Sequence, residues 1–247
     1  MSSYVFIMGV ARSGTTSLVT MLNAHPDVCL GNERYTKLAQ RGELTPEHFK
    51  HERFFDFRSE DTNSLPDFQK GGGLATQYRD LDNKWNTAHY FGDKVPHLFR
   101  EMPSVAANFP KSKFILIHRN IYDVALSWQK RADDISDHWP AKNNYKSAVQ
   151  AWNQCVDFMS SSQAAKIDML VLSYEDFFDG QSSQWEGLLD FLDLSEHSDL
   201  RAIFKRRVEK YQNNIKNKKR NLAVDMKMYI DRNSKPFPDF NVQITSS

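Results

Sequence analysis

A short apolar run that enters a loop of small residues and then a helix limits the fold of this chain more than any other feature. The run from Tyr4 to Met8 predicts a buried strand. The loop covers residues 9–16, and the helix continues to about residue 25. Amides of such a loop and of the helix start point inward, and the helix dipole adds partial positive charge. The pattern predicts a phosphate cradle; the alternative is an ordinary tight turn into a helix.

The loop is close to a Walker A sequence, but it lacks the lysine of nucleotide triphosphatases. The spacing of Gly9 and Gly14 fits, and Thr15 stands where the Walker A lysine would reach the β- and γ-phosphates. The cation here is Arg12, inside the loop. Binding of a magnesium triphosphate is therefore disfavoured, whereas a nucleotide phosphate can still be held by Arg12, the loop hydroxyls and the loop amides.

Apolar runs that alternate with helical patterns predict an α/β fold. We expect a three-layer fold like that of P-loop-containing nucleotide hydrolases, with helices on both faces of a central parallel sheet of about four to five strands. The expected strands are 4–8, 28–30, 89–93, 114–118 and 168–173, and the main helices are 15–25, 121–133, 142–163, 182–193 and 197–214. We expect one domain over 1–247, with an acceptor-binding or lid insertion at 34–91 and an irregular tail from about 230 to 247.

Composition excludes several function classes. The 26% charged residues and the mean hydropathy of −0.61 indicate a soluble surface. The formal net charge of +1 gives no global electrostatic field that would favour nucleic acid or a membrane as a partner. No run reaches the roughly 20 apolar residues that span a bilayer. Residues 201–220 hold nine lysines or arginines and one glutamate, which either bind an anion or form a solvated face. Cys29 and Cys155 lack metal-type spacing, so we expect buried thiols in a reducing compartment.

The loop and its helix resemble the 5′-phosphosulfate loop of sulfotransferases that use 3′-phosphoadenosine 5′-phosphosulfate (PAPS). The residues that carry the likeness are Gly-Val-Ala-Arg-Ser-Gly-Thr-Thr-Ser-Leu at 9–18 and Asn-Ala-His-Pro-Asp-Val at 23–28. The branch with protein-tyrosine sulfotransferases and many bacterial enzymes is the most similar. The resemblance implies that PAPS contacts Ala11, Arg12, Ser13, Gly14, Thr15, Thr16 and Ser17. The chain departs from relatives at Ala11, often a proline, and at Ser17, a tryptophan in the cytosolic branch, whose Gly-rich C-terminal motif is also missing.

The segment 113–128, Lys-Phe-Ile-Leu-Ile-His-Arg-Asn-Ile-Tyr-Asp-Val-Ala-Leu-Ser-Trp, resembles the 3′-phosphate motif of the same family. In that motif a strand ends in arginine and the next helix carries a serine; Arg119 and Ser127 stand at these positions. Apart from the resemblance, Arg119 follows a short apolar strand, at the sheet edge where open α/β sheets bind ligands. A guanidinium is also a planar, permanently charged partner for phosphate. The alternative is a surface arginine and a capping or solvent-facing serine.

Two shorter segments extend the resemblance. Gly-Asp-Lys-Val-Pro at 92–96 resembles the Lys-x-Pro element, which implies that Lys94 lies at the transferring sulfuryl group. The Tyr-Glu element after the strand at 168–173 implies that Tyr174 contacts the cofactor near its 3′-phosphate. Without the family, Lys94 would be a surface lysine and Tyr174 a half-buried aromatic at a strand end. In the basic C-terminal stretch, Lys218 and Arg220 are expected to bind the anionic cofactor.

Glu33 is the predicted general base. Aligning tyrosine-sulfating relatives on Gly31 puts Asn32 at their catalytic glutamate and Glu33 at the next position, whereas other branches keep a single glutamate close to Glu33. A carboxylate at a strand end can take the acceptor proton. The alternative is that Glu33 only forms an ion pair with Arg34 or Arg12.

The remaining catalytic roles follow from the charge of the transferring group. Lys94 and Arg12 are expected to stabilise that charge as the bond to the leaving phosphate breaks. If Glu33 is not the base, His118 and His97 are the next candidates, although a structural role is favoured for His118. Transfer is expected to proceed in line and to depend on positioning and electrostatics.

The predicted function is therefore a PAPS-dependent sulfotransferase, of the EC 2.8.2 type. It would move a sulfuryl group to a hydroxyl on a sugar, lipid, phenol or peptide tyrosine and release 3′-phosphoadenosine 5′-phosphate (PAP). No metal is required, because the sulfuryl group carries less charge than a terminal phosphate. Aromatic residues in 35–91 indicate a ring or apolar acceptor.

Two other classes stay open. An unusual P-loop kinase would use Glu175 and Asp176 as metal ligands, and a non-catalytic nucleotide-binding protein would keep only the fold. The sequence starts at the predicted first strand and shows no leader or anchor pattern before it, so we expect a cytoplasmic, bacterial protein with no nucleic-acid partner and no transmembrane segment. A piece cut from a larger protein would start in the same way. A homodimer is an open alternative.

Overall fold

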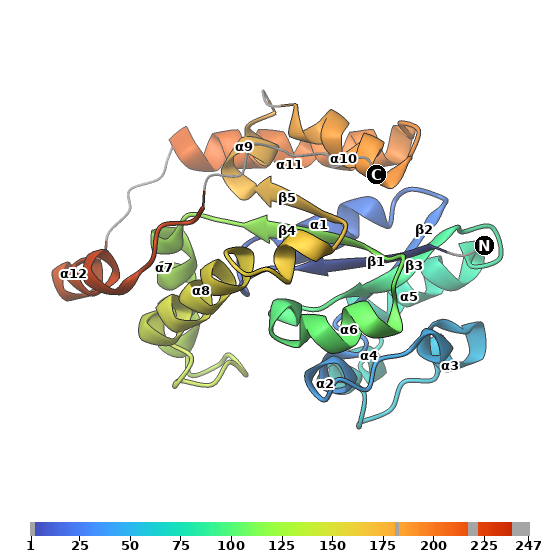
Figure 1. The fold of residues 1–247 in the computed structure, drawn as a ribbon, viewed down its shortest axis with the longest axis horizontal. Helices are drawn as coiled ribbons and strands as arrows, with labels where there is room; N and C mark the ends of the chain where they lie inside the picture. The colour runs from blue at the N-terminus through green and yellow to red at the C-terminus, as the bar shows by residue number, and fades with distance from the viewer. Residues whose placement is uncertain (1–2, 181–182, 217–221, 239–247) are drawn as a thin grey trace.

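Five parallel strands form one central sheet in the computed structural model, which describes residues 3–180, 183–216 and 222–238. The strands are β1 (Ser3–Met8), β2 (Val28–Asn32), β3 (Tyr90–Lys94), β4 (Lys113–His118) and β5 (Met169–Ser173). They lie in the order β2-β3-β1-β4-β5, so their carboxyl ends meet at one edge (Figure 1). The predicted α/β, P-loop-like fold is confirmed, and each strand lies within two residues of its predicted bounds.

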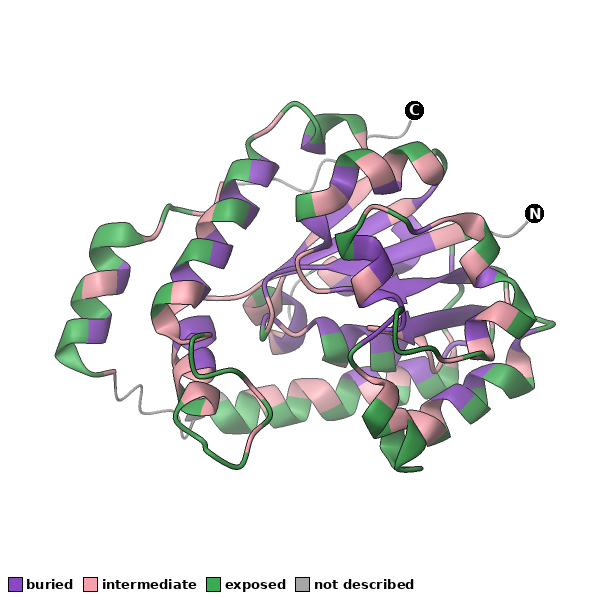
Figure 2. Cartoon of the chain, turned by 90° about the horizontal axis from the view of Figure 1, so that it is seen from below, coloured by how far each residue is buried: buried purple, intermediate pink, exposed green. Residues whose placement is uncertain are grey.

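Helices cover both faces of the sheet because β1 sends alternate side chains to opposite sides. Val5 and Ile7 pack with one helix layer, which contains α1 (Thr15–Leu22), α9 (Tyr174–Asp179), α10 (Gln184–Leu192) and α11 (Ser198–Lys216). Phe6 and Met8 pack with the other, which includes α6 (Met102–Asn108), α7 (Ile121–Ala132) and α8 (Tyr145–Met159). Figure 2 shows the buried strands between helices whose outer faces are exposed.

The segment 34–91 is built mainly from short helices. These are α2 (Thr36–Gln40), α3 (His51–Phe55), α4 (Leu65–Gln69) and α5 (Gly73–Lys84), with a 3₁₀ turn at Pro46–Phe49. Phe54 is fully buried and Tyr78 is 2% exposed, and both belong to the core. This corrects the expectation that the aromatics here face an acceptor. Five-residue helices are not stable alone, so packing against the sheet must hold them.

Helix α12 (Val224–Asn233) extends through residues 230–233, which were expected to belong to an irregular tail from about 230. Met226 and Ile230, one turn apart, are buried in the core, and Lys227 forms an ion pair with Asp231 one turn along. α12 packs on α7 and α8. Residues 234–238 continue without helix or strand. Among the described residues, no helix is both long and apolar enough to cross a membrane.

Candidate functional site

The loop between β1 and α1 requires glycine where it enters the helix. Gly14 has a left-handed backbone with φ 101°, and a Cβ atom there would lie 2.4 Å from Cδ2 of Tyr174. Only a residue without a side chain fits this position. The first amides of α1 have no acceptor within the helix, and the helix start lies at the carboxyl edge of the sheet (Figure 1). The loop therefore has the form of an anion-binding cradle.

Arg12 joins the loop to the segments that follow β4 and β5. Its Nε atom donates to Ser127 Oγ at 3.0 Å, and its carbonyl accepts from Nη1 of Arg119 at 3.3 Å. The guanidinium of Arg119 lies 4.4 Å from the centre of the Tyr174 ring, which is a cation–π distance. Four residues predicted from three separate motifs thus form one cluster, defined here as the loop–arginine cluster.

Two buried polar atoms, one in the loop and one in this cluster, lack a hydrogen-bond partner within the part of the chain that the structure describes. They are Ser13 Oγ and Arg119 Nε. Buried polar groups are nearly always satisfied, because leaving one unpaired costs free energy. Both atoms belong to groups that can donate a hydrogen bond, which makes them candidate donors to an anion bound at the loop.

A second group of predicted residues meets at the ends of β2 and β3. Lys94 is 1% exposed, and its Nζ atom lies 2.5 Å from Glu33 Oε1 and 3.2 Å from Thr16 Oγ1. Glu33 therefore forms its ion pair with Lys94 and not with Arg34 or Arg12, the two partners that the sequence suggested. The Glu33 side chain is 41% exposed, so a ligand can reach its carboxylate. A cation, a carboxylate and the start of α1 are therefore in direct contact.

Two residues hold the loop at Ala11, a role that was not predicted for either of them; His97 was expected only as an alternative base, and Trp128 was not singled out. The Ala11 amide donates to Nε2 of His97 at 3.1 Å, and its carbonyl accepts from Nε1 of Trp128 at 2.8 Å. Burial lowers the pKa of His97 to about 3, so the ring is neutral and its Nε2 lone pair is already used. This geometry gives His97 a structural role rather than that of a base. Trp128, directly after the predicted Ser127, could have been suspected from that position.

His118, the other candidate base, lies in a different environment. It stacks on Phe237 with ring centres 3.9 Å apart, and burial lowers its pKa to about 4. Together with Trp152 and Glu175, the two rings line a cavity of about 490 Å³. The stacked, neutral ring fits the structural role that the sequence favoured.

The other predicted ligand residues lie in α1, in α9 and outside the described residues. Thr15 is buried in the first turn of α1, and Ser17 is partly exposed in the same helix. Lys218 and Arg220 lie outside the described residues. Glu175, a candidate metal ligand of the kinase alternative, accepts the Asn120 amide with both carboxylate oxygens, at 3.1 and 3.3 Å.

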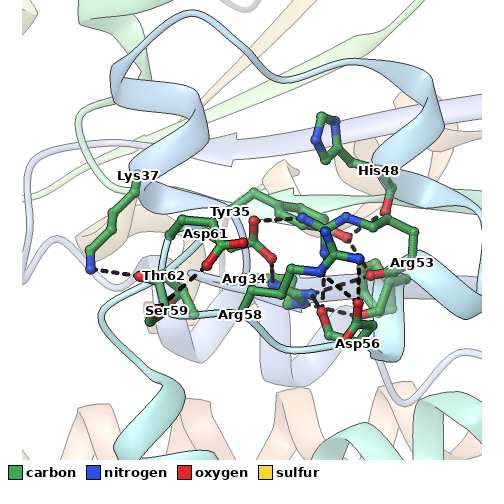
Figure 3. A network of polar contacts seen from close by, with 12 residues as sticks. Arg34, Tyr35, Lys37, His48, Arg53, Asp56, Arg58, Ser59, Asp61 and Thr62 are labelled. Atoms are coloured by element: carbon green, nitrogen blue, oxygen red, sulfur yellow. Dashed lines mark hydrogen bonds and ion pairs between the residues drawn. The ribbon is translucent and has the colours of Figure 1, made fainter.

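A buried ionic network lies within the segment 34–91 (Figure 3) and leads to the backbone of Glu33. Arg34 and Asp61 are both fully buried, with Nη1 and Oδ2 2.9 Å apart, and Arg53 reaches the second oxygen of Asp61 at 2.5 Å. The next residue, Thr62, donates its hydroxyl to the Glu33 carbonyl at 2.6 Å. The network therefore ends at the backbone of the site.

Comparison with known proteins adds a family match. A model described as the sulfotransferase family matches residues 4–199. Protein-tyrosine sulfotransferase 1 of Danio rerio is 26% identical over 191 residues, which cover 77% of this chain and 53% of that protein. The human protein of the same name is 25% identical over 155 residues, covering 63% of this chain and 41% of that protein. The chain spans about half the length of the curated relatives it matches.

Solved structures resemble the fold. The sulfotransferase domain of the Synechococcus PCC 7002 olefin synthase gives a TM-score of 0.52 at 18% identity, covering 96% of both chains. A sulfotransferase of Mycobacterium tuberculosis H37Rv gives 0.52 at 14% identity, covering 88% of this chain and 77% of that chain. These likenesses support the three-layer architecture with a central parallel sheet.

Proposed function

This chain belongs to the sulfotransferase family, and we propose that it transfers a sulfuryl group from PAPS to a hydroxyl acceptor. The observation that carries the proposal is the contact of the buried Lys94 ammonium with both the Glu33 carboxylate and the Thr16 hydroxyl of α1. This contact joins an anion-binding loop to a cation and a base. Together they are the groups that transfer to a hydroxyl requires.

The residues at the loop fit an anionic donor. The unpartnered donors at Ser13 and Arg119, together with the start of α1, offer hydrogen bonds and positive charge to phosphate and sulfate oxygens. Arg12 and Ser127 already hydrogen-bond to each other beside them. PAPS would supply the activated sulfuryl group and a phosphate leaving group.

The proposed reaction gives separate tasks to Glu33, Lys94 and Arg12. Glu33 accepts the proton of the acceptor hydroxyl at its exposed carboxylate. Lys94 stabilises negative charge near the bond that breaks, and Arg12 adds a second cation. Because these side chains supply the positive charge, the proposal needs no metal ion. Positioning for in-line displacement falls to the loop–arginine cluster.

The acceptor is proposed by class. Glu33 can activate any hydroxyl that reaches it, whether on a sugar, a lipid, a phenol or a peptide tyrosine. The names of the curated relatives favour peptide tyrosine for a first trial. We also propose a reducing, cytoplasmic compartment, which the two free, buried thiols Cys29 and Cys155 support.

The kinase alternative is less well supported by the same geometry. Thr15 stands at the Walker lysine position, and Glu175 is engaged with the Asn120 backbone. A non-catalytic protein would have no need for the contact between Lys94 and Glu33.

Thermal unfolding with PAP, adenosine 5′-phosphate or Mg-ATP tests the proposal. A ligand that binds only the folded state stabilises it by about 2.7 kcal/mol at a hundred times its dissociation constant. We expect a shift with PAP that Arg119→Ala abolishes and that Arg41→Ala, an exposed arginine paired with Glu43, retains. No shift with PAP, or a larger one with Mg-ATP, would reject the proposal.

A further inference from the structure

Asp93 is a fully buried carboxylate directly before Lys94 in β3. Its Oδ1 atom accepts the Arg34 amide at 3.1 Å, and its Oδ2 atom accepts the Tyr35 amide at 2.8 Å. These two amides follow Glu33 in the chain. Asp93 therefore binds the backbone beside the proposed base through both of its carboxylate oxygens.

The backbone that Asp93 holds is strained. Glu33 has φ 61°, a left-handed conformation that residues with a side chain adopt only when their surroundings impose it. The Glu33 amide donates to the Lys94 carbonyl at 2.9 Å, and its carbonyl accepts from Thr62 Oγ1 at 2.6 Å. With the two bonds to Asp93, this conformation is fixed on both sides, and the side chain is directed to Lys94.

Gly31 provides the space for this carboxylate. It pairs with Asp93 across β2 and β3, and a Cβ atom on Gly31 would lie 2.6 Å from Asp93 Oδ1 and 2.8 Å from the Cβ of Arg34. A side chain there would displace the carboxylate from the amides. The site thus combines a glycine, a buried acid and a strained residue.

The fully buried environment of Asp93 disfavours a charged carboxylate. Burial raises its pKa to about 7, while the two backbone amides and the charges of Lys94 and Arg34 act in the opposite direction. Burying a carboxylate is costly unless its oxygens are satisfied. An amide side chain would offer one acceptor oxygen instead of two, so a carboxylate is the group that can bind both amides.

We propose that Asp93 is a positioning residue, which holds Glu33 in its left-handed conformation so that the Glu33 carboxylate meets Lys94. The inference rests on the proposed function of Glu33 as the base. It adds a residue that acts through Glu33 and contacts no substrate.

A double-mutant cycle tests this dependence. We expect Asp93→Asn to lower kcat about 10- to 100-fold, since small displacements of a catalytic group have effects of this size, and to leave PAP affinity unchanged. Added to Glu33→Gln, it should have no further effect on kcat, because the residue through which it acts is already disabled. An unchanged kcat, or an equal loss in both backgrounds, would overturn the proposal.

If Asp93→Asn does not fold, Gly31→Ala replaces it in the cycle. The added methyl group displaces the Asp93 carboxylate, while Asp93 itself remains a carboxylic acid. Asn23→Ala is the matched control: Asn23 exchanges two hydrogen bonds of 2.8 Å with the Leu30 backbone. It should lower the melting temperature without altering kcat or the effect of Glu33→Gln.

Amide hydrogen exchange separates this inference from the proposed function. Displacing the Asp93 carboxylate should accelerate exchange at the amides of Glu33, Arg34 and Tyr35, whereas Asn23→Ala should not. If the wild-type protein transfers no sulfuryl group but these amides respond, the proposed function fails and the positioning role stands. If the Glu33 amide does not respond, the positioning role is overturned whatever the activity.

Discussion

The Nζ atom of Lys94 lies 2.5 Å from Oε1 of Glu33, although the two residues are 61 positions apart in the chain. Parallel pairing explains the contact: Asn32 and Lys94 are register partners at the ends of β2 and β3, so the residue after β2 meets the last residue of β3. The sheet itself therefore assembles the proposed base and cation.

Removal of the Lys94 ammonium should affect turnover more than donor binding. Lys94→Met keeps most of the buried stem, and loss of one charge-stabilising group lowers kcat by about 10²- to 10³-fold in well-studied enzymes. Steady-state kinetics and PAP calorimetry measure the two effects. Lys37→Met, which removes a surface lysine bound to the Ser59 carbonyl, is the control. A kcat equal to that of the wild type would contradict the role of Lys94.

Arg119→Lys should weaken PAP binding even though it keeps the charge. The guanidinium stacks on Tyr174 and also reaches the Arg12 carbonyl, and a lysine cannot reproduce this planar fork. A lost hydrogen bond to a charged group is worth about 1.5–3 kcal/mol, or about 10- to 100-fold in the dissociation constant. Calorimetry measures the difference. An affinity equal to that of the wild type would place the phosphate elsewhere.

His97 should make the protein less stable in acid. Its pKa is lowered from 6.5 to about 3 by burial. Between these two pH values the histidine is protonated in the unfolded chain and stays neutral in the folded chain. The stabilising contribution is present above pH 6.5 and is lost as the pH falls towards 3. Urea unfolding between pH 7 and 4.5 should show a smaller loss of stability for His97→Gln than for the wild type. Parallel curves would show that His97 is protonated freely in the folded state.

Asp61→Asn should strongly destabilise the fold. It leaves the fully buried Arg34 without its charge partner, and breaking a buried pair costs about 3–5 kcal/mol. Arg58→Met breaks an exposed pair with Asp56 in the same segment (Figure 3) and should change stability by about 0–1 kcal/mol. Urea unfolding compares the two variants. Equal losses would mean that burial of the network does not matter.

The sequence allowed the sheet to be predicted because buried parallel strands are continuous apolar runs. Residues next to strand ends, such as Lys94, Glu33 and Arg119, could then be assigned to one edge without a structure. The resemblance supplied their roles.

Contacts between distant segments could not be predicted in this way. His97 and Trp128 meet the loop across 86 and 117 positions, and no local pattern indicates these contacts. The short helices of 34–91 and the helix α12 also gave weak local signals. Tertiary packing, such as the burial of Phe54 and Ile230, stabilises them rather than intrinsic propensity.

Transfer of ³⁵S from labelled PAPS to a panel of hydroxyl acceptors, beginning with tyrosine peptides and including sugars, lipids and phenols, tests the central claim most directly. The account predicts a labelled acceptor with the wild-type protein and with Lys37→Met, and little label with Lys94→Met or Glu33→Gln. Label on no acceptor in the panel, or transfer that survives both site substitutions, would contradict it.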